Sequence, residues 1–497
     1  MAGIRDYGAY IPYNRLERSS IAQTWGGYPK KGEKAVANFD EDTVTMAVEA
    51  ARACLSQGGN EKVDRFYFAS TTAPYAEKQA ASLAAAALDL SPGAFTMDVA
   101  GSLRAGTSGI CAALDALRGN SATNALVTAS DMRLGAPNGA KEMDFGDGAA
   151  ALVLARDDVI AEIDAYYTVN HEIFDQFRPA DHPYVLSWED RFVREMGFSR
   201  VVVKAVTAAM AQFNVSWSDI TIPVLTSPNP GYLKGIAKKF GWDPKLAAMD
   251  AIYPRAGNTG CAHSFLLLCH ALDRAEPGDR ILWANYGDGC DVMLLTVTDR
   301  ILERKRGGVE TQLATGSPTT YPKYLRWRNL VETEPPMRPR QEPVSAPALY
   351  RDRRCGMALQ GSKCRECGTV QYPVQRICMN CRAKDSFDYY AFADRQGRVV
   401  TFSHDLLGVT PDPPTTVAAV DFEEGGRIMV DITDRDPKEI AINMAVEMTF
   451  RKFRRTNGIQ VYWWKSRPVR KAQMMPLGKD QSSTVGGVAA RVDGGGK

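Results

Sequence analysis

The sequence lacks the features that mark secreted and membrane-spanning chains. No apolar run approaches the roughly 18 residues that cross a bilayer, and the opening stretch MAGIRDYGAYIPYNRLERSS has no charged segment followed by an apolar one. It also lacks a charge imbalance, because 60 Lys and Arg face 58 Asp and Glu. A near-neutral chain gives no support for nucleic acid or an acidic surface as a partner. We therefore expect a cytoplasmic protein that binds neither nucleic acid nor membrane.

Cysteine is present, but in a pattern that does not suggest disulfides. Four of the ten cysteines form two CxxC pairs, Cys364 with Cys367 and Cys378 with Cys381. A CxxC turn places two thiolates on one side of a metal ion, and two such turns complete a tetrahedral shell without an open position. The pattern predicts a structural zinc site, with redox or free cysteine pairs as the alternative. The other six cysteines are expected to be small buried side chains.

Residues 1 to about 300 alternate short apolar runs with amphipathic stretches of helical length. The strand-like runs are Arg65–Ser70, Ala125–Ala129, Ala149–Leu154, Ile222–Leu225 and Ile281–Asn285. The helix-like stretches are Asp42–Gln57, Ala80–Leu90, Thr107–Arg118, Ser199–Phe213 and Cys261–Ala275. Strands that alternate with helices of this length predict an α/β sheet fold.

This region contains an internal repeat. Phe145-Gly146-Asp147-Gly148 precedes one apolar run, and Tyr286-Gly287-Asp288-Gly289 precedes another, 141 residues later. Gly-Asp-Gly alone is common turn chemistry, so the weight lies in its recurrence in matching contexts. The repeat predicts two similar α/β halves, residues 1–160 and 161–302.

Beyond residue 302 the composition changes. Pro, Thr, Arg and Glu dominate residues 303–348, which predicts a connector in which the segment YPKYLRWRNL packs on a domain. The cysteine pairs place a zinc ribbon at 349–390. Five short strand-like runs then predict a small β-barrel, an OB-fold, at 391–470. The Gly- and Ser-rich tail 471–497 is expected to be disordered.

Several stretches resemble a known family: VIAEIDAYYTVNHEIFDQFRPADHPYV, SPNPGYLKGIAKKFGW and RAGNTGCAHSFLLLCHALDRAEPGDRILWANYGDG. They are similar to the 3-hydroxy-3-methylglutaryl-CoA synthases of the thiolase superfamily, over roughly residues 1–300. The resemblance implies a duplicated five-layer α/β/α/β/α fold, a coenzyme A thioester as substrate and a dimer. The remainder resembles zinc-ribbon and OB-fold proteins that accompany thiolases on acyl-CoA pathways.

The resemblance also locates the family's catalytic positions, and three of the four are replaced. Leu103 stands where the family has its nucleophilic Cys at the start of a buried helix. Thr71 aligns with the family's Glu and Thr226 with its His, whereas Asn258 is retained. The implied acyl-CoA-binding residues are Ser102, Leu103, Arg104, Thr71, Thr226 and Ser227.

Covalent acyl transfer needs a nucleophile, but aldol or retro-aldol chemistry on a β-hydroxyacyl-CoA does not. It needs a base for the hydroxyl group and stabilisation of the enolate, for which main-chain amides near Leu103 or Asn258 are candidates. The candidate catalytic residues are Tyr286, Asp288, His263, Asn258 and Tyr75. The sequence therefore favours an acyl-CoA lyase.

Two alternatives stay open at this point. One is a non-catalytic subunit that binds acyl-CoA for an active thiolase or synthase chain. The other is an acyltransferase with a relocated nucleophile such as Cys261. A homodimer or a heteromer with another thiolase-superfamily chain is expected in each case.

The OB-like region carries basic and aromatic side chains of the kind that bind nucleic acid. Since the net charge is close to zero, we expect these residues to pack against the first domain instead. They are Arg451, Lys452, Arg454, Arg455, Tyr462, Trp463 and Trp464.

Overall fold

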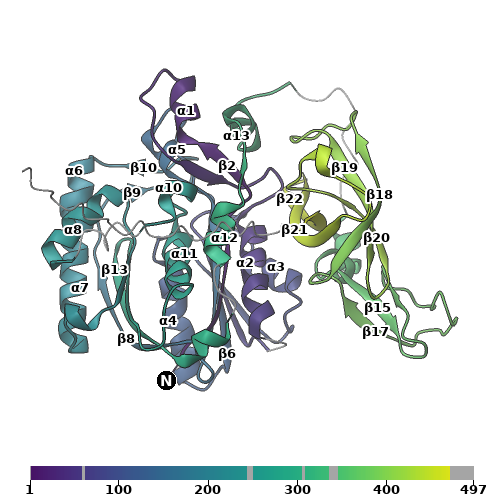
Figure 1. Ribbon diagram of the computed structural model, residues 1–497, viewed down its shortest axis with the longest axis horizontal. Coiled ribbons are helices and arrows are strands. Elements are labelled where there is room, and N and C mark those ends of the chain that lie inside the picture. The colour runs from purple at the N-terminus through teal and green to yellow at the C-terminus, as the bar shows by residue number, and fades with distance from the viewer. Residues whose placement is uncertain (1, 59–61, 243–249, 305–307, 335–344, 471–497) are drawn as a thin grey trace, which may run out of the picture.

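A computed structural model describes residues 2–58, 62–242, 250–304, 308–334 and 345–470 (Figure 1). A large α/β domain is followed by a smaller β-rich part that packs beside it. The tail for which disorder was predicted, 471–497, lies outside the described residues.

The first half of the large domain contributes five strands. In chain order they are β1 (Gly3–Tyr10), β4 (Arg65–Ala69), β5 (Phe95–Val99), β6 (Asn124–Asp131) and β7 (Gly148–Ala155). They lie in the order β5-β4-β6-β7-β1, with β4 parallel to both β5 and β6 and with β7 antiparallel to both β6 and β1. Every residue of β1, β6 and β7 is buried, which explains why these strands are apolar along their whole length.

The second half repeats this arrangement. Its strands are β8 (Ala161–Asn170), β11 (Ile222–Leu225), β12 (Arg280–Tyr286) and β13 (Gly289–Val297), in the order β11-β12-β13-β8. β13 is antiparallel to β8 and β12, and β12 is parallel to β11. In the first half, β7 is likewise antiparallel to β1 and β6, and β6 is parallel to β4. The duplication predicted from the two Gly-Asp-Gly segments is confirmed, because each segment leads directly into the corresponding strand, β7 or β13.

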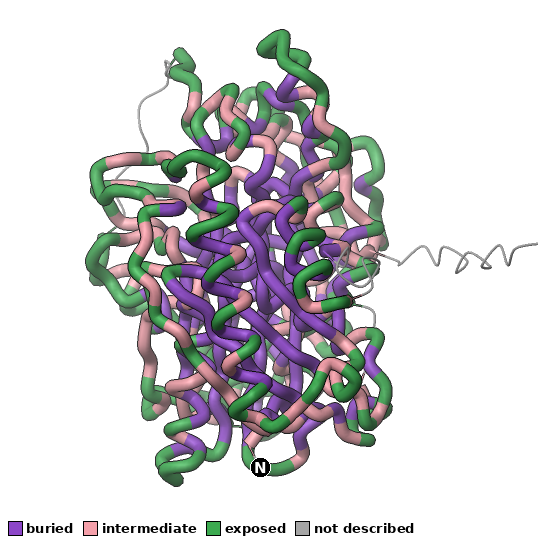
Figure 2. Tube along the Cα trace, turned by 90° about the vertical axis from the view of Figure 1, so that its left-hand side faces the viewer, coloured by how far each residue is buried: buried purple, intermediate pink, exposed green. Residues whose placement is uncertain are grey.

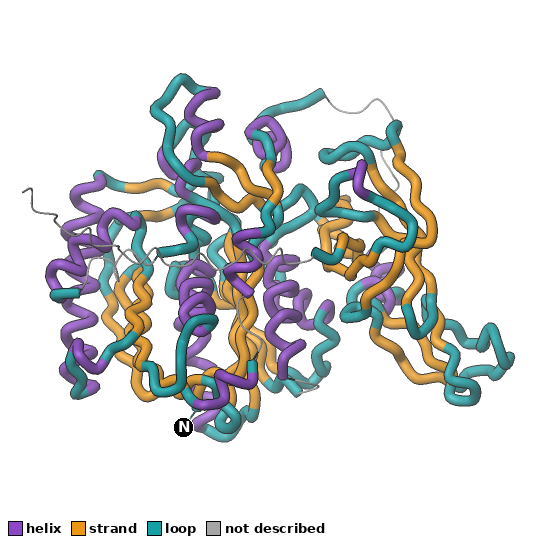
Figure 3. Tube along the Cα trace, viewed as in Figure 1, coloured by secondary structure: helices purple, strands orange, loops and turns teal. Residues whose placement is uncertain are grey.

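Helices form three of the five layers (Figures 1 and 3). The middle layer, between the two halves of the sheet, contains α4 (Ala105–Arg118) and α11 (Cys261–Leu272). One outer layer contains α2 (Thr43–Gly58) and α3 (Ala80–Ala87). The other outer layer contains α7 (Arg200–Phe213) and α8 (Leu233–Phe240). Every residue of α11 except His270 is buried, and Figure 2 shows the buried chain running through the centre. A side chain at Gly106 would meet the Phe265 ring at 2.5 Å, so this glycine lets the central helices pack closely.

Short elements complete the large domain. The strands are β2 (Asn14–Glu17), β3 (Glu33–Val36), β9 (Gln176–Phe177), β10 (Leu186–Ser187) and β14 (Ser317–Pro318). The helices are α1 (Arg18–Thr24), α5 (Ala140–Asp144), α6 (Asp190–Phe192), α10 (Tyr253–Ala256), α12 (Gly308–Ala314) and α13 (Tyr321–Trp327). Further single turns of helix span Val193–Ser199, Trp217–Asp219, Pro230–Tyr232 and Asp299–Glu303.

The segment expected to be a connector is largely folded onto the large domain. α12 and α13 lie within it, and β14 pairs with β2. α13 buries Tyr321, Tyr324 and Trp327 in a cluster with Leu16 and Val36. The packing predicted for YPKYLRWRNL is therefore present, and less of the chain remains between the domains than the composition suggested.

The C-terminal part contains two small β units. After α14 (Ala346–Arg351) and α15 (Arg353–Gly356), the first unit has β15 (Gln360–Cys364), β16 (Val370–Gln371) and β17 (Phe387–Ala391). The second has β18 (Gln396–Asp405), β19 (Thr415–Phe422), β20 (Arg427–Asp431), β21 (Ala445–Thr456) and β22 (Ile459–Pro468), with a helical turn at Pro437–Glu439. Its strand order is β20-β19-β18-β21-β22, and a bridge between Ile432 and Ser466 brings the two edges together into a barrel.

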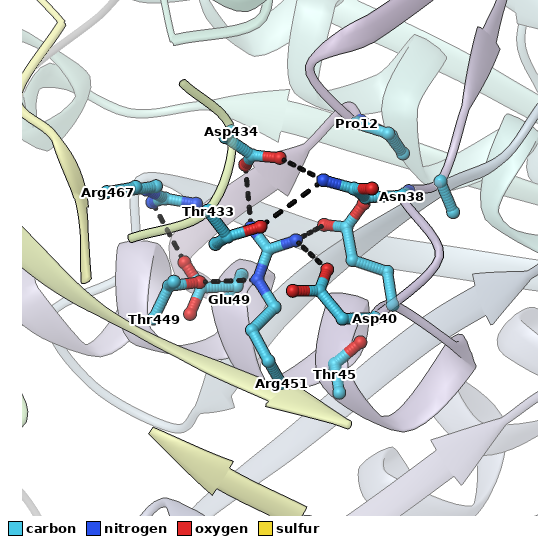
Figure 4. A network of polar contacts seen from close by, with 12 residues as sticks. Pro12, Asn38, Asp40, Thr45, Glu49, Thr433, Asp434, Thr449, Arg451 and Arg467 are labelled. Carbon is cyan, nitrogen blue, oxygen red and sulfur yellow. Dashed lines mark hydrogen bonds and ion pairs between the residues drawn. The ribbon is translucent and has the colours of Figure 1, made fainter. Parts of the chain in front are cut away.

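The barrel is attached to the large domain by a buried ion network that joins β21 to the segment directly before α2 (Figure 4). Arg451 is fully buried, and its guanidinium lies 3.3 Å from Asp40, 2.9 Å from Glu41 and 2.7 Å from Asp434. Asp40 and Glu41 belong to the large domain and Asp434 to the barrel. Because a buried charge is tolerated only when it is paired, this network fixes the barrel in one position.

The network confirms that part of the basic and aromatic set in the barrel packs against the large domain. Besides Arg451, the Tyr462 hydroxyl donates to Asp42 over 2.8 Å. Arg467, which was not in the predicted set, also pairs with Glu49 of α2, at 2.9 Å. The aromatic rings of Tyr462 and Trp464 are also buried. These side chains are therefore occupied by the interface between the domains.

Candidate functional site

A cavity of about 170 Å³ lies where the two halves of the large domain meet. Its walls come from segments that follow the carboxyl ends of β4, β5, β6, β8, β11 and β12, which is the usual position of a ligand site in an α/β sheet. The lining residues are Thr71, Gly101, Ser102, Leu103, Arg133, Asp175, Gln176, Phe177, Arg178, Val185, Pro228, Tyr286, Gly287 and Asp288.

Leu103 lies at this cavity, in the turn directly before α4. Gly287 packs against it so closely that a side chain at Gly287 would come within 2.9 Å of the Leu103 Cβ. Arg104 holds the two segments together, since its guanidinium donates to the Gly287 and Asp288 carbonyls and pairs with Asp291 at 2.8 Å. Leu103 offers the cavity a hydrocarbon surface beside a helix N-terminus, a place where main-chain dipoles favour negative charge.

The cavity contains a tyrosine that is hydrogen-bonded to an aspartate. The Tyr286 hydroxyl donates to Asp175 Oδ2 over 2.6 Å, and both residues are buried. The Phe198 ring stands edge-on to Tyr286 at 5.4 Å and fixes its plane. Burial raises the pKa of Asp175, and burial together with the neighbouring Asp175 carboxylate raises the pKa of Tyr286 well above its usual value. The pair can therefore pass a proton while the phenol stays protonated at rest.

Thr71 also lines the cavity and is held in place by Asp131. The Thr71 hydroxyl and main-chain N–H both donate to this carboxylate, at 2.9 and 2.7 Å. Asp131 also accepts from the hydroxyls of Ser70 and Thr72 and from the Cys261 N–H. Both of its oxygens are thus fully used, and Asp131 fixes the loop after β4 relative to the start of α11.

Thr226 and Ser227 lie behind the cavity wall. The Thr226 hydroxyl donates to Asn285 over 3.0 Å, and the Asn285 amide reaches the Leu103 carbonyl at 3.3 Å. Asn258 donates to the Ser227 carbonyl and accepts from the Gly260 N–H. These residues shape the cavity wall through hydrogen bonds between loops of the two halves.

Two of the predicted proton-handling residues lie elsewhere. His263 is buried in α11, where its Nε2 contacts Asp250 at 2.9 Å and its Nδ1 faces Thr259. The Tyr75 hydroxyl accepts a hydrogen bond from the Gln460 N–H of the barrel at 2.6 Å. His263 therefore has a structural role within the core around α11, and Tyr75 belongs to the interface between the domains.

The cysteine proposed as a relocated nucleophile is also enclosed. Cys261 has no exposed surface, and its thiol faces the carbonyls of Ala69 and Ser130. Burial, with the Asp131 carboxylate nearby, raises the pKa of the Cys261 thiol well above its usual value. A thiol that resists ionisation is a poor nucleophile, and no cysteine is among the described residues that line the cavity.

The four CxxC cysteines come together in the zinc ribbon. Cys364 and Cys381 Sγ lie 3.6 Å apart, as do Cys367 and Cys378 Sγ, and all four sulfurs lie within 4.8 Å of one another. Zn–S bonds of about 2.3 Å in a tetrahedron require sulfurs about 3.8 Å apart. The four thiolates therefore fit a closed, structural zinc ion.

Of the residues predicted from sequence, the structure brings Thr71, Ser102, Leu103, Tyr286 and Asp288 to the cavity, with Arg104 bracing it. It adds Arg133, Asp175, Gln176 and Arg178, which were not predicted. The last three lie in the quoted stretch FDQFRP. No local pattern in that stretch marks these residues as lining a cavity.

Among the described residues, no helix combines the length and the apolar character that crossing a membrane requires.

Three family models match the chain. One described as the C-terminal part of 3-oxoacyl-[acyl-carrier-protein] synthase III matches residues 210–297. The ChsH2 rubredoxin-like zinc ribbon domain matches 359–386, and the ChsH2 C-terminal OB-fold domain matches 390–451. The zinc ribbon and barrel predicted from sequence are thereby confirmed.

Curated relatives and solved structures agree with this. The hydroxymethylglutaryl-CoA synthase of Pyrobaculum aerophilum is 30% identical over 344 residues, which cover 66% of this chain and 98% of the relative. That of Methanocaldococcus jannaschii is 35% identical over 312 residues, 61% of this chain and 90% of the relative. A crystal structure of HMG-CoA synthase complexed with CoA shares the fold, with a TM-score of 0.61 at 19% identity over 65% of this chain and 89% of that one. The chain therefore belongs to the hydroxymethylglutaryl-CoA synthase family of the thiolase superfamily, and it carries C-terminal zinc-ribbon and OB-fold domains of the ChsH2 kind.

Proposed function

We propose that this protein is a cytoplasmic acyl-CoA lyase that cleaves the C–C bond of a β-hydroxyacyl-CoA by a retro-aldol reaction, without an acyl-enzyme intermediate. The observation that carries the proposal is the Tyr286–Asp175 pair, which lines the same cavity as Leu103. The site thus offers a proton-transfer pair beside a helix N-terminus and, among the described lining residues, no cysteine thiol.

In the proposed reaction the β-hydroxyl proton passes to the Tyr286 oxygen as the Tyr286 proton passes to Asp175. The bond between the α and β carbons then breaks. Its electron pair forms the thioester enolate, and the β carbon becomes a carbonyl. The enolate takes the proton back through the same pair, which yields a shorter acyl-CoA. The positive end of α4 favours the negative charge on the enolate oxygen.

The names of the relatives support a second candidate, an acyltransferase of the hydroxymethylglutaryl-CoA synthase kind. That reaction needs a nucleophile that accepts an acyl group. Incubation with acetyl-CoA followed by intact-mass measurement separates the two functions. An acetyl group on a cysteine would support the acyltransferase and contradict the lyase.

A third candidate is a non-catalytic subunit, favoured by the hydrocarbon side chain of Leu103 at the cavity. Such a subunit would bind acyl-CoA, show no turnover alone and restore activity to a partner chain. The lyase proposal requires turnover by the purified chain itself.

We also propose that the chain pairs with itself or with another thiolase-superfamily chain. β5 forms the outer edge of the nine-stranded sheet, and an edge strand is a natural place for a second chain to pair. The cavity-lining turn at Ser102 follows β5 directly, so a partner there would lie close to the site. Light scattering of the purified protein tests this.

A further inference from the structure

One side chain of the cavity is a buried cation that has no ion-pair partner among the described residues. Arg133 follows β6, lines the cavity and is only 6% exposed. Its guanidinium lies over the Phe145 ring at 4.3 Å from the ring centre. Nη2 donates to the Gln176 side-chain oxygen over 3.3 Å, whereas Nη1 has no hydrogen-bond partner among the described residues. A buried guanidinium in this state costs free energy, because water has been removed and little has replaced it.

The neighbouring carboxylates favour the charge on Arg133 without forming an ion pair with it, and they are hydrogen-bonded to other donors. Asp131 accepts from Ser70, Thr71, Thr72 and Cys261. Asp175 accepts from Tyr286 and from the Gln176 N–H. Neither forms an ion pair with Arg133 within the part of the chain that the structure describes. The described residues therefore leave room for an acceptor supplied by a bound ligand.

A second donor at the same wall lacks an acceptor. The amide Nε2 of Gln176 is buried and has no partner among the described residues. The side-chain oxygen of Gln176 accepts the hydrogen bond from Arg133, so the two side chains lie together. Between them, Arg133 Nη1 and Gln176 Nε2 can donate to a ligand. Arg178 lies at the rim, but its exposed guanidinium already donates to the Thr71 carbonyl over 2.9 Å and is not part of this unit.

We propose that Arg133 and Gln176 form a subsite for a carboxylate carried by the acyl chain of the substrate, so that the substrates are acyl-CoA thioesters with a second, anionic end. This rests on the proposed function in one respect, that the cavity receives an acyl-CoA. A guanidinium and an amide N–H together match a carboxylate, with two oxygens to satisfy. The cavity of about 170 Å³ has room for a short chain between that carboxylate and the thioester.

The test measures binding, not turnover, with thioesters that lack a β-hydroxyl group. Each pair has equal carbon number and differs in a terminal carboxylate or methyl group: malonyl- and propionyl-CoA, succinyl- and butyryl-CoA, glutaryl- and valeryl-CoA. The protein is expected to bind the carboxylated member of at least one pair about ten-fold or more tightly, as charged hydrogen bonds in a buried site predict. R133M is expected to abolish this preference, and R133K to retain part of it.

Two controls separate recognition from folding. R178M removes an exposed guanidinium from the same rim and should reduce the preference by no more than about two-fold, because solvent screens it. R133M should melt at the same temperature as the unmodified protein or higher, since it removes an unpaired buried charge.

The outcomes distinguish this inference from the function on which it rests. Equal binding within every pair, or a preference that survives R133M, overturns the carboxylate subsite and leaves the lyase proposal standing. Failure of all six thioesters to bind contradicts the proposed function itself.

Discussion

The Tyr286 hydroxyl donates to Asp175 across 2.6 Å, although the two residues are 111 positions apart in the chain. The contact joins the end of β12 to the segment after β8, and Leu103 lies at the same cavity. This relationship supplies proton transfer to a site that presents no cysteine among its described lining residues.

The first prediction concerns Tyr286. Y286F keeps the ring that packs on Phe198 but removes the hydroxyl that exchanges a proton with Asp175. We expect kcat for retro-aldol cleavage to fall about 10²-fold or more, as is typical when a general acid-base group is lost. Acyl-CoA affinity should change little. Y232F is a matched control, because it removes the hydroxyl of a tyrosine whose ring also packs on Phe198 but which does not line the cavity, and it should retain activity.

The second prediction concerns the pH dependence of the reaction. The Asp175 carboxyl must be ionised to accept the Tyr286 proton, and burial raises its pKa. The rate should therefore fall as the pH is lowered, and the fall should begin at a higher pH than an ordinary aspartate would give. Since the pKa of Tyr286 is raised as well, no loss of activity through its ionisation is expected at moderately alkaline pH.

A pH–rate profile of D175N is the comparison. It should be slow throughout and lack the acidic limb. An acidic limb that persists unchanged in D175N would assign the titration to another group.

The third prediction concerns attachment of the barrel. R451M removes the cation that Asp40, Glu41 and Asp434 share. Asp40 keeps Lys465 and Asp434 keeps Arg470, but Glu41 loses the ion pair that the structure gives it, and removing one partner of a buried ion network costs about 3–5 kcal/mol. We expect the urea midpoint of the domain interface to fall accordingly, measured by tryptophan fluorescence. R427M breaks the exposed Arg427–Asp421 pair of the same barrel, and surface pairs are worth about 0–1 kcal/mol. Equal effects of the two substitutions would contradict the role given to Arg451.

The fourth prediction concerns the metal. The purified protein should contain one zinc ion per chain, and C364S should lose it. Because the ribbon forms around the four thiolates, chelation is expected to unfold it and to leave the large domain intact. Metal analysis and limited proteolysis before and after chelation check this. Full resistance of the ribbon to proteolysis after metal removal would show that zinc does not hold it.

The features that could be predicted from sequence are those that depend on local residue spacing or on an internal repeat. The CxxC pairs at Cys364 and Cys378 placed the zinc ribbon because their geometry depends on a few adjacent residues. The duplicated half was visible because Gly146 and Gly287 occupy matching turns. Leu103 was identified because it stands at the family's nucleophile position, and Tyr286 because it precedes the tight Gly287-Asp288-Gly289 turn at a strand end.

The residues that were missed depend on contacts between distant loops. Asp175 and Gln176 lie in a segment with little regular structure, so nothing in their local sequence indicates that they face Tyr286 and Arg133. Tyr75 was misplaced for the same reason, because the barrel that binds its hydroxyl lies almost 400 residues later, at Gln460. The positions of these side chains depend on how distant loops pack together, and the local sequence around each residue does not indicate that packing.

The most direct test of the lyase account is to treat the protein with iodoacetamide, supply a β-hydroxyacyl-CoA, and follow both products and intact protein mass. The account predicts that a carbonyl compound and a shorter acyl-CoA are released, and that no acyl group is added to the protein. An acyl adduct on a cysteine of the untreated protein, or loss of C–C cleavage after alkylation, would contradict it.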